Sequence, residues 1–475
     1  MAFIIGNRTQ QTFLPPVIDD YIDEHDPVRA YDAFIESLDF KSLGIPLVPG
    51  GSADEYFPKD LLKLIVYGCS YGLRSGRNLE RACHHNLSFI WLMRGSKPYY
   101  RTITRFRKKY KKAITKVLKQ CVRMCIKLDL IEGNILFVDG SKIQANASIK
   151  NTWTKKKCKK MLKKIDKRID ALQKEWESVD AQEEGQESFV KAKENLKDQE
   201  KLKSKMKNIL KELGTENKKS LNTTDNDCAT MKSAHGSHAS YNVQNVVDSK
   251  HGLIVNTDAV NENDDKNQFA NQIDQANEIL ENKCKTACGD SGYANTTELE
   301  KIDKQGIKVV VPSQRQALHK EEKPFSKSQF TYDKERDQYQ CPEGHILRFR
   351  GINKNKQHRV YSIKSPKICE SCKHYKVCTE SKHGRRVTRL INEEVREKFE
   401  RQYEQPDSQE IYKHRKEKVE LPFGHFKHNL GARSFLLRGK DHVKSEASLL
   451  STCFNIARMI TIIGVPELIL KLNSL

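Results

Sequence analysis

The stretch from residue 151 to 220 is the feature that most limits how this chain folds. It is rich in Lys and Glu and poor in Pro, and its apolar side chains recur at alternating steps of three and four residues, which is the spacing of one helix face. The members of this series are Leu162, Ile165, Ile169, Leu172, Trp176, Val179, Leu202, Met206, Ile209 and Leu213. With a polar turn at 182–187 between its halves, the stretch predicts an antiparallel helical hairpin inserted into another domain.

The sequence on either side has a different periodicity. Residues 1–128 read as short helices, with Asp26-Pro27 and Pro58 at helix starts. Residues 129–475 contain about five β-like apolar runs separated by helical stretches, which predicts an α/β fold with a mixed sheet. We therefore expect an all-α N-terminal domain and an α/β domain, the latter interrupted by the 151–220 hairpin and by a Cys-rich segment at 313–390.

The charge of the chain indicates a polyanionic partner. Its 475 residues carry a formal charge of +22, from 84 Lys and Arg against 62 Asp and Glu, and nucleic acid is the simplest such partner. Residues 101–127 hold eleven Lys or Arg and no acid. A helix face that is only exposed to solvent usually carries both positive and negative side chains. The candidate DNA contacts in the N-terminal region are Arg74, Arg77, Arg105, Arg107 and Lys108.

Targeting signals and disulfides are not expected. The start of the chain lacks the basic and apolar regions of a secretory signal, and no apolar run approaches the length that crosses a bilayer. The protein is therefore expected to be cytoplasmic and to have no membrane partner. The thirteen cysteines are odd in number and mostly scattered, so most are expected to be small buried core residues.

Three distant acidic residues each have the local setting of a metal ligand. Asp139 ends the apolar run at 135–138, Asp290 follows a short apolar run and precedes Ser291-Gly292, and Glu420 lies in a basic stretch. Such a trio could hold two Mg²⁺ or Mn²⁺ ions, the arrangement that polarises a phosphodiester and activates its nucleophile. Each Asp taken alone is more often a turn or helix cap.

Four cysteines in the 313–390 segment form a second candidate metal site. They are Cys341, Cys369, Cys372 and Cys378. A Cys-x2-Cys pair with two further thiols can close a tetrahedral zinc site and stabilise a loop-rich segment. His374 or His345 could replace one sulfur, and free, reduced thiols are the alternative.

Several motifs, in order along nearly the whole chain, resemble those of bacterial insertion-sequence transposases that use a DDE triad on an RNase-H-like fold. The motifs are Asp26-Pro-Val-Arg-Ala-Tyr-Asp-Ala-Phe, Asp60-Leu-Leu-Lys-Leu with Tyr67-Gly, Leu73-Arg-Ser-Gly-Arg-Asn-Leu-Glu80, Val138-Asp-Gly-Ser-Lys142 and Val419-Glu-x-x-Phe-Gly-x-x-Lys427. The resemblance implies that Asp139, Asp290 and Glu420 are the catalytic metal ligands, with Asp139 bridging both ions.

The resemblance also implies a Tyr, Arg, Glu, Lys signature around the third acid. Here Tyr412, Arg415 and Lys427 match it, although four residues instead of the usual three separate Arg415 from Glu420. On one helix Lys416, Glu420 and Lys427 would share a surface able to grip DNA phosphates, but Pro422 leaves open whether the helix is continuous or begins near Leu421.

The function expected from the resemblance is that of a DNA transposase. Such an enzyme binds the double-stranded ends of its own element, cleaves DNA with metal-activated water and joins the 3′ hydroxyl to target DNA, acting as a homo-oligomer on DNA. Two alternatives remain open at this point: a non-catalytic DNA-binding regulator derived from a transposase, and a junction-cutting or RNA-directed nuclease on the same fold.

Overall fold

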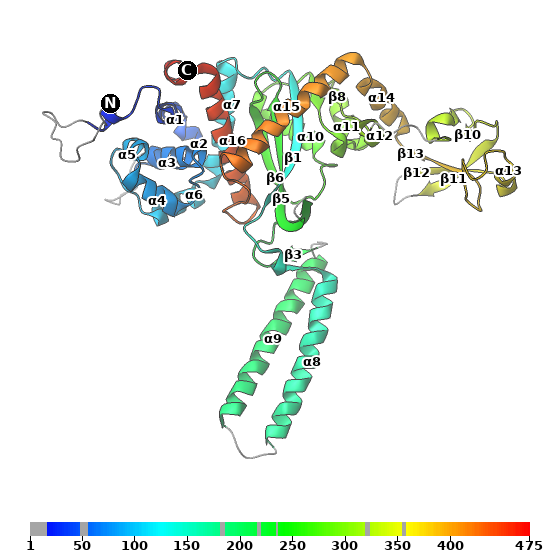
Figure 1. The fold of residues 1–475 in the computed structure, drawn as a ribbon, viewed down its shortest axis with the longest axis horizontal. Helices are drawn as coiled ribbons and strands as arrows, with labels where there is room; N and C mark the ends of the chain where they lie inside the picture. Colours follow the sequence, from blue (N-terminus) through cyan, green and yellow to red (C-terminus); the bar gives the residue numbers. More distant parts are fainter. Residues whose placement is uncertain are drawn as a thin grey trace, which may run out of the picture. The chain divides into compact units, whose positions relative to one another are not determined.

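The structure is a computed structural model that describes residues 17–47, 56–180, 186–215, 220–233, 236–318, 324–353 and 358–475 (Figure 1). The chain divides into two compact units. Unit 1 comprises residues 1–265, 272–284 and 416–475, and unit 2 comprises residues 266–271 and 285–415. The α/β class and the helical N-terminal region predicted from the sequence are confirmed.

Short helices fill the N-terminal part of unit 1. They are η1 (Ile18–Tyr21), α1 (Pro27–Glu36), α2 (Phe40–Leu43), α3 (Pro58–Ser70), α4 (Gly76–His85), α5 (Leu87–Leu92), α6 (Tyr100–Lys109) and α7 (Lys111–Lys127). Local chemistry sets their starts: the Asp26 side chain accepts a hydrogen bond from the Val28 amide, and Pro27 and Pro58 occupy first-turn positions. Helices α1, α4, α6 and α7 bury an apolar face, whereas α3 is buried over most of its length, Lys63 included.

Four antiparallel strands form the sheet of unit 1. They are β1 (Ile135–Gln144), β4 (Ala229–Ser233), β5 (Gly236–Asp248) and β6 (Ile254–Val260). Strand β5 pairs with each of the other three. The register places Asp139 opposite Asn245 and Asn245 opposite Thr257, so these three residues form one row across the sheet and share a face.

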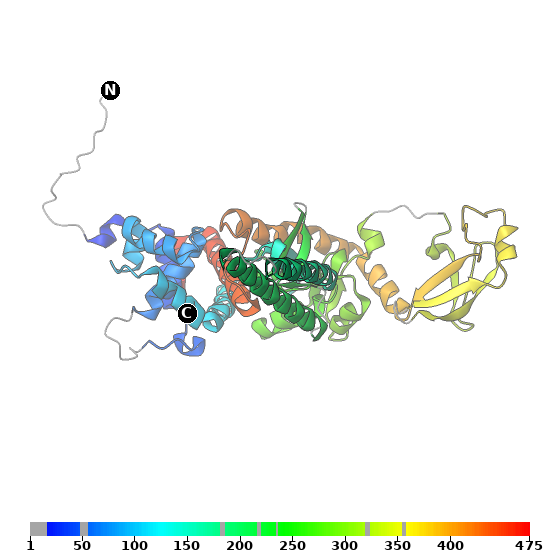
Figure 2. The ribbon, with the colours of Figure 1, turned by 90° about the horizontal axis from the view of Figure 1, so that it is seen from below.

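Helices α8 (Lys155–Asp180) and α9 (Gln186–Thr215) pack along each other (Figures 1 and 2). Their shared core includes Cys158, Ile165, Ile169, Met206, Ile209 and Leu213. Next to this pair, β2 (Thr152–Trp153) and β3 (Leu221–Asn222) pair antiparallel, preceded by η2 (Ile149–Asn151). Residues 181–185, most of the predicted turn at 182–187, lie outside the described residues.

The C-terminal helices complete the core of unit 1. They are the end of α15 (Pro406–His428), α16 (Lys440–Ile463) and α17 (Val465–Asn473). Helix α16 packs on α3, α7 and β6, and Asn455 in it both donates to and accepts from the Ile254 backbone, at 2.8 and 2.9 Å. Among the described helices, α16 alone is long and apolar enough to cross a membrane, and 67% of its apolar window is buried within the protein, as in a core helix.

Unit 2 contains a parallel strand pair and a separate small sheet. The parallel pair is β7 (Thr286–Cys288) and β8 (Lys308–Val310). The small sheet has the strand order β13 (Arg386–Leu390), β12 (His358–Ile363), β11 (Ile346–Asn353), β10 (Gln338–Gln340) and β9 (Thr331–Asp333). The other elements are η3 (Ser291–Tyr293), α11 (Thr296–Asp303), α12 (Gln314–Ala317), η4 (Lys327–Gln329), α13 (Pro366–Glu370), α14 (Glu393–Tyr403) and the start of α15, while α10 (Phe269–Leu280) contributes residues to both units.

Candidate active site

Asp139 lies in the middle of β1, on a polar row that crosses the sheet of unit 1. Its neighbour on β5 is Asn245, whose Oδ1 accepts a hydrogen bond of 2.7 Å from the Thr257 hydroxyl on β6. The Asn245 amide nitrogen is buried and has no hydrogen-bond partner among the described residues. A buried amide donor beside a carboxylate is costly in a purely structural sheet, so this row is a candidate for binding an oxygen-rich ligand.

The position after Asp139 has no room for a side chain, which accounts for Gly140. A Cβ at this position would lie 2.4 Å from Nε2 of Gln244 and 2.6 Å from Oδ1 of Asp265. The same Asp265 oxygen accepts hydrogen bonds from Gln244 at 2.6 Å and from Asn242 at 2.7 Å. Since successive residues of a strand point to opposite faces, this carboxylate lies across the strand from the Asp139 side chain. No sequence pattern pointed to it.

Helix α15 is continuous through Pro422, which settles the question that the sequence left open. Its buried stripe in unit 1 consists of Val419, Phe423 and Phe426. Because Pro422 can be accommodated without breaking the helix, Glu420 and Lys427 keep the seven-residue spacing that puts them on nearly the same face.

Two lysines tie α15 along β1. The Lys418 ammonium donates to the Lys250 carbonyl at 3.3 Å, next to the start of β1, where the Ser249 amide donates to the Ile135 carbonyl. The Lys427 ammonium donates to the Ser141 hydroxyl at 2.6 Å. The helix therefore follows the strand from its start to two residues beyond Asp139, and Glu420 lies between the two anchor points.

Lys427 is affected by the carboxylate of Asp139. Burial lowers the pKa of Lys427, and the negative charge of Asp139 acts in the opposite direction. Glu420 is exposed. No group of three or more His, Cys, Asp or Glu side chains in the described part of the chain stands in a metal-binding arrangement, so the structure presents the acids without a closed metal site.

Asp290 belongs to unit 2, where it follows β7. Its Oδ1 accepts a hydrogen bond of 2.8 Å from the Gly292 amide and caps η3. Its Oδ2 lies 3.7 Å from Nη2 of Arg415. The side chain is 41% exposed, so Asp290 acts as a turn cap and also presents an oxygen beside a cation.

The remaining signature residues of unit 2 pack around Asp290. Arg415 is buried, and Tyr412 stacks edge-on against Tyr403 with ring centroids 5.2 Å apart. Burial raises the pKa of Tyr412. It also raises the pKa of the neighbouring Cys288 thiol to about 12. Tyr412 therefore has a packing role in this structure, whether or not it also contacts DNA.

Two of the predicted DNA contacts have internal partners. Arg74 is buried: its guanidinium lies 3.1 Å from Glu446 and donates to the Gly431 and Ser434 carbonyls at 3.2 and 2.7 Å. Arg107 donates to the Arg74 carbonyl, and burial lowers the pKa of Arg107. These contacts do not favour Arg74 and Arg107 as DNA ligands, because binding phosphate would require breaking buried hydrogen bonds.

The other predicted cations are accessible. Arg77, Arg105, Lys108 and Lys416 are exposed, and the Arg77 guanidinium lies over the Tyr100 ring, 5.1 Å from its centroid. Sequence alone could not separate them from Arg74, since burial depends on the packing of α4 and α6 and not on residue type.

The four predicted zinc ligands line one small cavity of about 30 Å³ in unit 2. His374 and His345 line it as well, but Nε2 of His374 lies 3.0 Å from Glu343 and its ring packs on Phe325.

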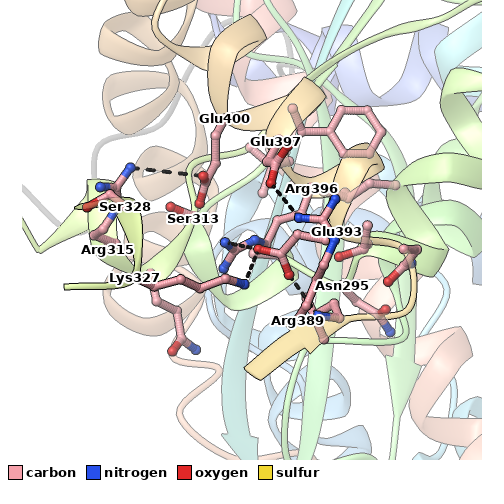
Figure 3. A pocket seen from close by; sticks show the side chains of 18 of the residues that line it. Asn295, Ser313, Arg315, Lys327, Ser328, Arg389, Glu393, Arg396, Glu397 and Glu400 are labelled. Atoms are coloured by element: carbon pink, nitrogen blue, oxygen red, sulfur yellow. Dashed lines mark hydrogen bonds and ion pairs between the residues drawn. The ribbon is translucent and has the colours of Figure 1, made fainter. Parts of the chain in front are cut away.

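A larger pocket of about 870 Å³ in unit 2 contains none of the predicted acids. Its charges are largely paired: in Figure 3, Lys327 and Arg396 both reach the buried Glu393, and Arg389 reaches Glu397. Its cations are therefore poorly suited to binding a polyanion.

Comparison with known families gives two matches. Residues 340–460 match a transposase DDE domain, and residues 16–109 match a transposase domain, DUF772. No curated protein and no solved structure gives a match. The first match contains Glu420 and Lys427, and the second contains the exposed arginines of α4 and α6. Both matches in one chain, in this order, support an insertion-sequence DDE transposase.

Proposed function

We propose that this transposase binds the ends of its mobile element, cleaves them in a metal-dependent reaction and transfers the freed 3′ strand to target DNA. The observation that carries the proposal is the seating of α15 along β1, which brings the Lys427 ammonium two residues from Asp139 with Glu420 two turns earlier on the same helix face. The catalytic domain is proposed to be RNase-H-like, with α8–α9 and the Cys-rich sheet as insertions. The working form is proposed to be a homo-oligomer on DNA in the cytoplasm.

The residues fit a pair of divalent cations in their donor chemistry. Asp139, Asp290 and Glu420 supply hard carboxylate oxygens, which Mg²⁺ and Mn²⁺ prefer. Bound metal ions would polarise the scissile phosphate and activate the attacking hydroxyl or water. The half-buried Lys427 holds a positive charge near Asp139 and orients the strand edge through Ser141. The unpaired Asn245 amide can donate to a phosphate or water oxygen in the same row.

DNA binding is assigned to the accessible cations. Arg77, Arg105, Lys108 and Lys416 present their charges to solvent, where they can contact the phosphate backbone. Arg415 and Tyr412 are proposed to act near the cleaved end, with Arg415 orienting Asp290 through the ion pair between them.

The test compares Asp139→Asn with Asp264→Asn, an exposed acid of the same unit. The expected result is that Asp139→Asn loses Mg²⁺-dependent cleavage of element-end DNA while retaining end binding, and that Asp264→Asn retains both. Cleavage by the Asp139→Asn protein at the wild-type rate would refute the assignment. End binding without any cleavage by the wild-type protein would favour a non-catalytic DNA-binding regulator.

A further inference from the structure

The four partly exposed cysteines of this chain converge on one place. All thirteen cysteines are free, and nine are buried; the other four are Cys341, Cys369, Cys372 and Cys378. These four line the same cavity of about 30 Å³, a volume suited to a single small ligand. We propose that this cavity is a structural zinc site with four thiolate ligands.

Two tight turns present the thiols. In the first, after β10, the Cys341 carbonyl accepts from the Gly344 amide at 2.8 Å and the Cys341 amide donates to the His345 carbonyl at 2.9 Å. In the second, the Cys372 amide donates to the Cys369 carbonyl at 3.3 Å. The second turn brings Cys369 and Cys372 to one side, the arrangement of a Cys-x2-Cys zinc ligand pair.

Arg385 places polar groups beside two of the cysteines. Burial raises the pKa of the Cys378 thiol, and the Arg385 guanidinium acts in the opposite direction. The Arg385 amide donates to Sγ of Cys369 at 3.4 Å, and the Arg385 guanidinium donates to the Cys378 carbonyl at 2.9 Å. Four thiolates on one Zn²⁺ leave two negative charges, so an adjacent guanidinium and an N–H to sulfur hydrogen bond stabilise the bound form. His374 already interacts with Glu343, which favours four sulfurs over a mixed set.

The small sheet has a physical need for such a site. Its buried core in the described residues is a cluster of five side chains: Phe330, Tyr339, Leu347, Tyr361 and Val387. Cys341 and Cys378 pack at the edge of this cluster. A core of this size contributes little stability by itself, and metal binding supplies folding free energy directly. In the described residues the thiols do not stand in a closed ligand geometry, so zinc binding requires their side chains to rotate toward one another.

The experiment measures metal content and ligand type on the full-length protein. Wild-type protein is expected to contain one zinc per chain and, after exchange with Co²⁺, to show the visible absorption of tetrahedral thiolate-bound cobalt. Cys372→Ser is expected to lose at least tenfold in zinc content, whereas the control Cys284→Ala, a buried cysteine outside the cavity, keeps it. If Cys372→Ser does not fold, a second measurement uses wild-type protein, whose thiols are titrated with a mercurial reagent. Zinc should then be released in proportion to the number of thiols modified. Wild-type protein without zinc, or zinc retained by Cys372→Ser, would overturn the proposal.

An independent observation concerns the charge of α8. Between Lys155 and Arg168 the helix carries nine Lys or Arg and one acid, Asp166, and all nine cations are exposed. None of the nine forms an ion pair with a described acid, while Asp166 pairs with Lys203 of α9. Cations at the start of a helix also oppose its dipole. A local arrangement that costs stability is expected to serve binding.

We infer that this face of α8 binds the phosphate backbone of duplex DNA, an inference that rests on the proposed function. The nine cations span about 20 Å of helix, enough to contact several phosphates. Other exposed faces of the hairpin have mixed charge: on α9, Lys197 and Lys201 alternate with Asp198 and Glu200. The α8 face is therefore the better match to a polyanion.

The test removes four charges from each helix and measures the salt dependence of affinity for a random-sequence duplex. One variant changes Lys156, Lys160, Lys163 and Lys167 to Gln, and the control changes Lys197, Lys201, Lys205 and Lys211 to Gln. Each lost phosphate contact reduces the slope of log K against log salt by about 0.9, so the four substitutions in the α8 variant are expected to reduce the slope by up to roughly 3.6 and those in the α9 variant by less than 1. If the wild-type protein binds DNA and the two variants reduce the slope equally, only the DNA-binding role of the α8 face is refuted. Absence of DNA binding by the wild-type protein would instead contradict the proposed function.

Discussion

The buried pair of Arg74 and Glu446 allows a sharp test of the packing. The pair joins the segment just before α4 to α16, with side-chain exposures of 9% and 7%. Glu446 also accepts hydrogen bonds from the Leu436 and Leu437 amides. Replacing Arg74 with Met keeps most of the side-chain volume but leaves a buried carboxylate and two buried carbonyls without their cation.

The expected cost is about 3–5 kcal/mol, the usual penalty for removing one partner of a buried pair. Burial already raises the pKa of Glu446, and Arg74 opposes that effect. For an acid with a raised pKa in the folded state, the stability linked to the shift is present below its unfolded pKa, about 4.3, and is lost as the pH rises through the folded value. Removing Arg74 raises the folded pKa further, so the penalty of Arg74→Met should be larger at pH 8 than at pH 5.

The assay is urea unfolding at both pH values, with Arg77→Met as the matched control. Arg77 lies three residues after Arg74, in the first turn of α4, and is exposed, so its replacement should change stability by about 0.5 kcal/mol or less while weakening DNA binding. Glu446→Gln combined with Arg74→Met should recover part of the loss, because the carboxylate that lost its partner is no longer present. If Arg74→Met were as stable as Arg77→Met at both pH values and bound DNA weakly, Arg74 would be a DNA contact and the internal assignment would be wrong.

Three further outcomes are expected. Gly140→Ala should destabilise the protein by about 1–3 kcal/mol, since its Cβ would overlap Gln244 and Asp265; unchanged thermal unfolding would contradict this. Because burial raises the pKa of the Cys288 thiol to about 12, iodoacetamide at pH 8 should label Cys288 in denatured but not native protein, as read by peptide mass spectrometry. Glu420→Gln should reduce Mg²⁺-dependent cleavage by on the order of 100-fold, whereas Glu417→Gln on the same helix should stay within about twofold; equal rates would remove Glu420 from the site.

Local periodicity in the sequence predicts much of the fold. The three-and-four spacing of Ile165, Ile169, Met206 and Ile209 predicts helices with a shared apolar seam, and these residues are buried together. Asp26-Pro27 likewise predicts the start of α1 because the cap is made by neighbours in sequence. Such features depend on chemistry within a few residues, which a single sequence contains.

The burial of basic residues was not predictable in the same way. Arg74, Arg77, Arg105 and Lys108 are equivalent as residue types in a basic segment, yet only Arg74 meets Glu446, 372 residues later in the chain. Its partner lies in α16, far away in the sequence, so no local pattern distinguishes Arg74 from its neighbours. The position of Asp265 was not predictable for the same reason, because its carboxylate occupies the space that Gly140, a residue distant in sequence, leaves open.

Helix α15 shows how a local rule can fail in a part of the chain that matters for function. A proline inside a helix removes a hydrogen bond and usually bends or ends it, yet α15 continues through Pro422. Tertiary contacts account for this: Phe423 and Phe426 are buried, and the Lys418 and Lys427 ammonium groups hold the helix at both ends of the stretch that contains Glu420. A proline at this position limits how the two halves of the helix can move, because Pro fixes its own φ angle. The arrangement therefore holds Glu420 and Lys427 in a constant relation along β1, which is what the catalytic role proposed for Glu420 requires.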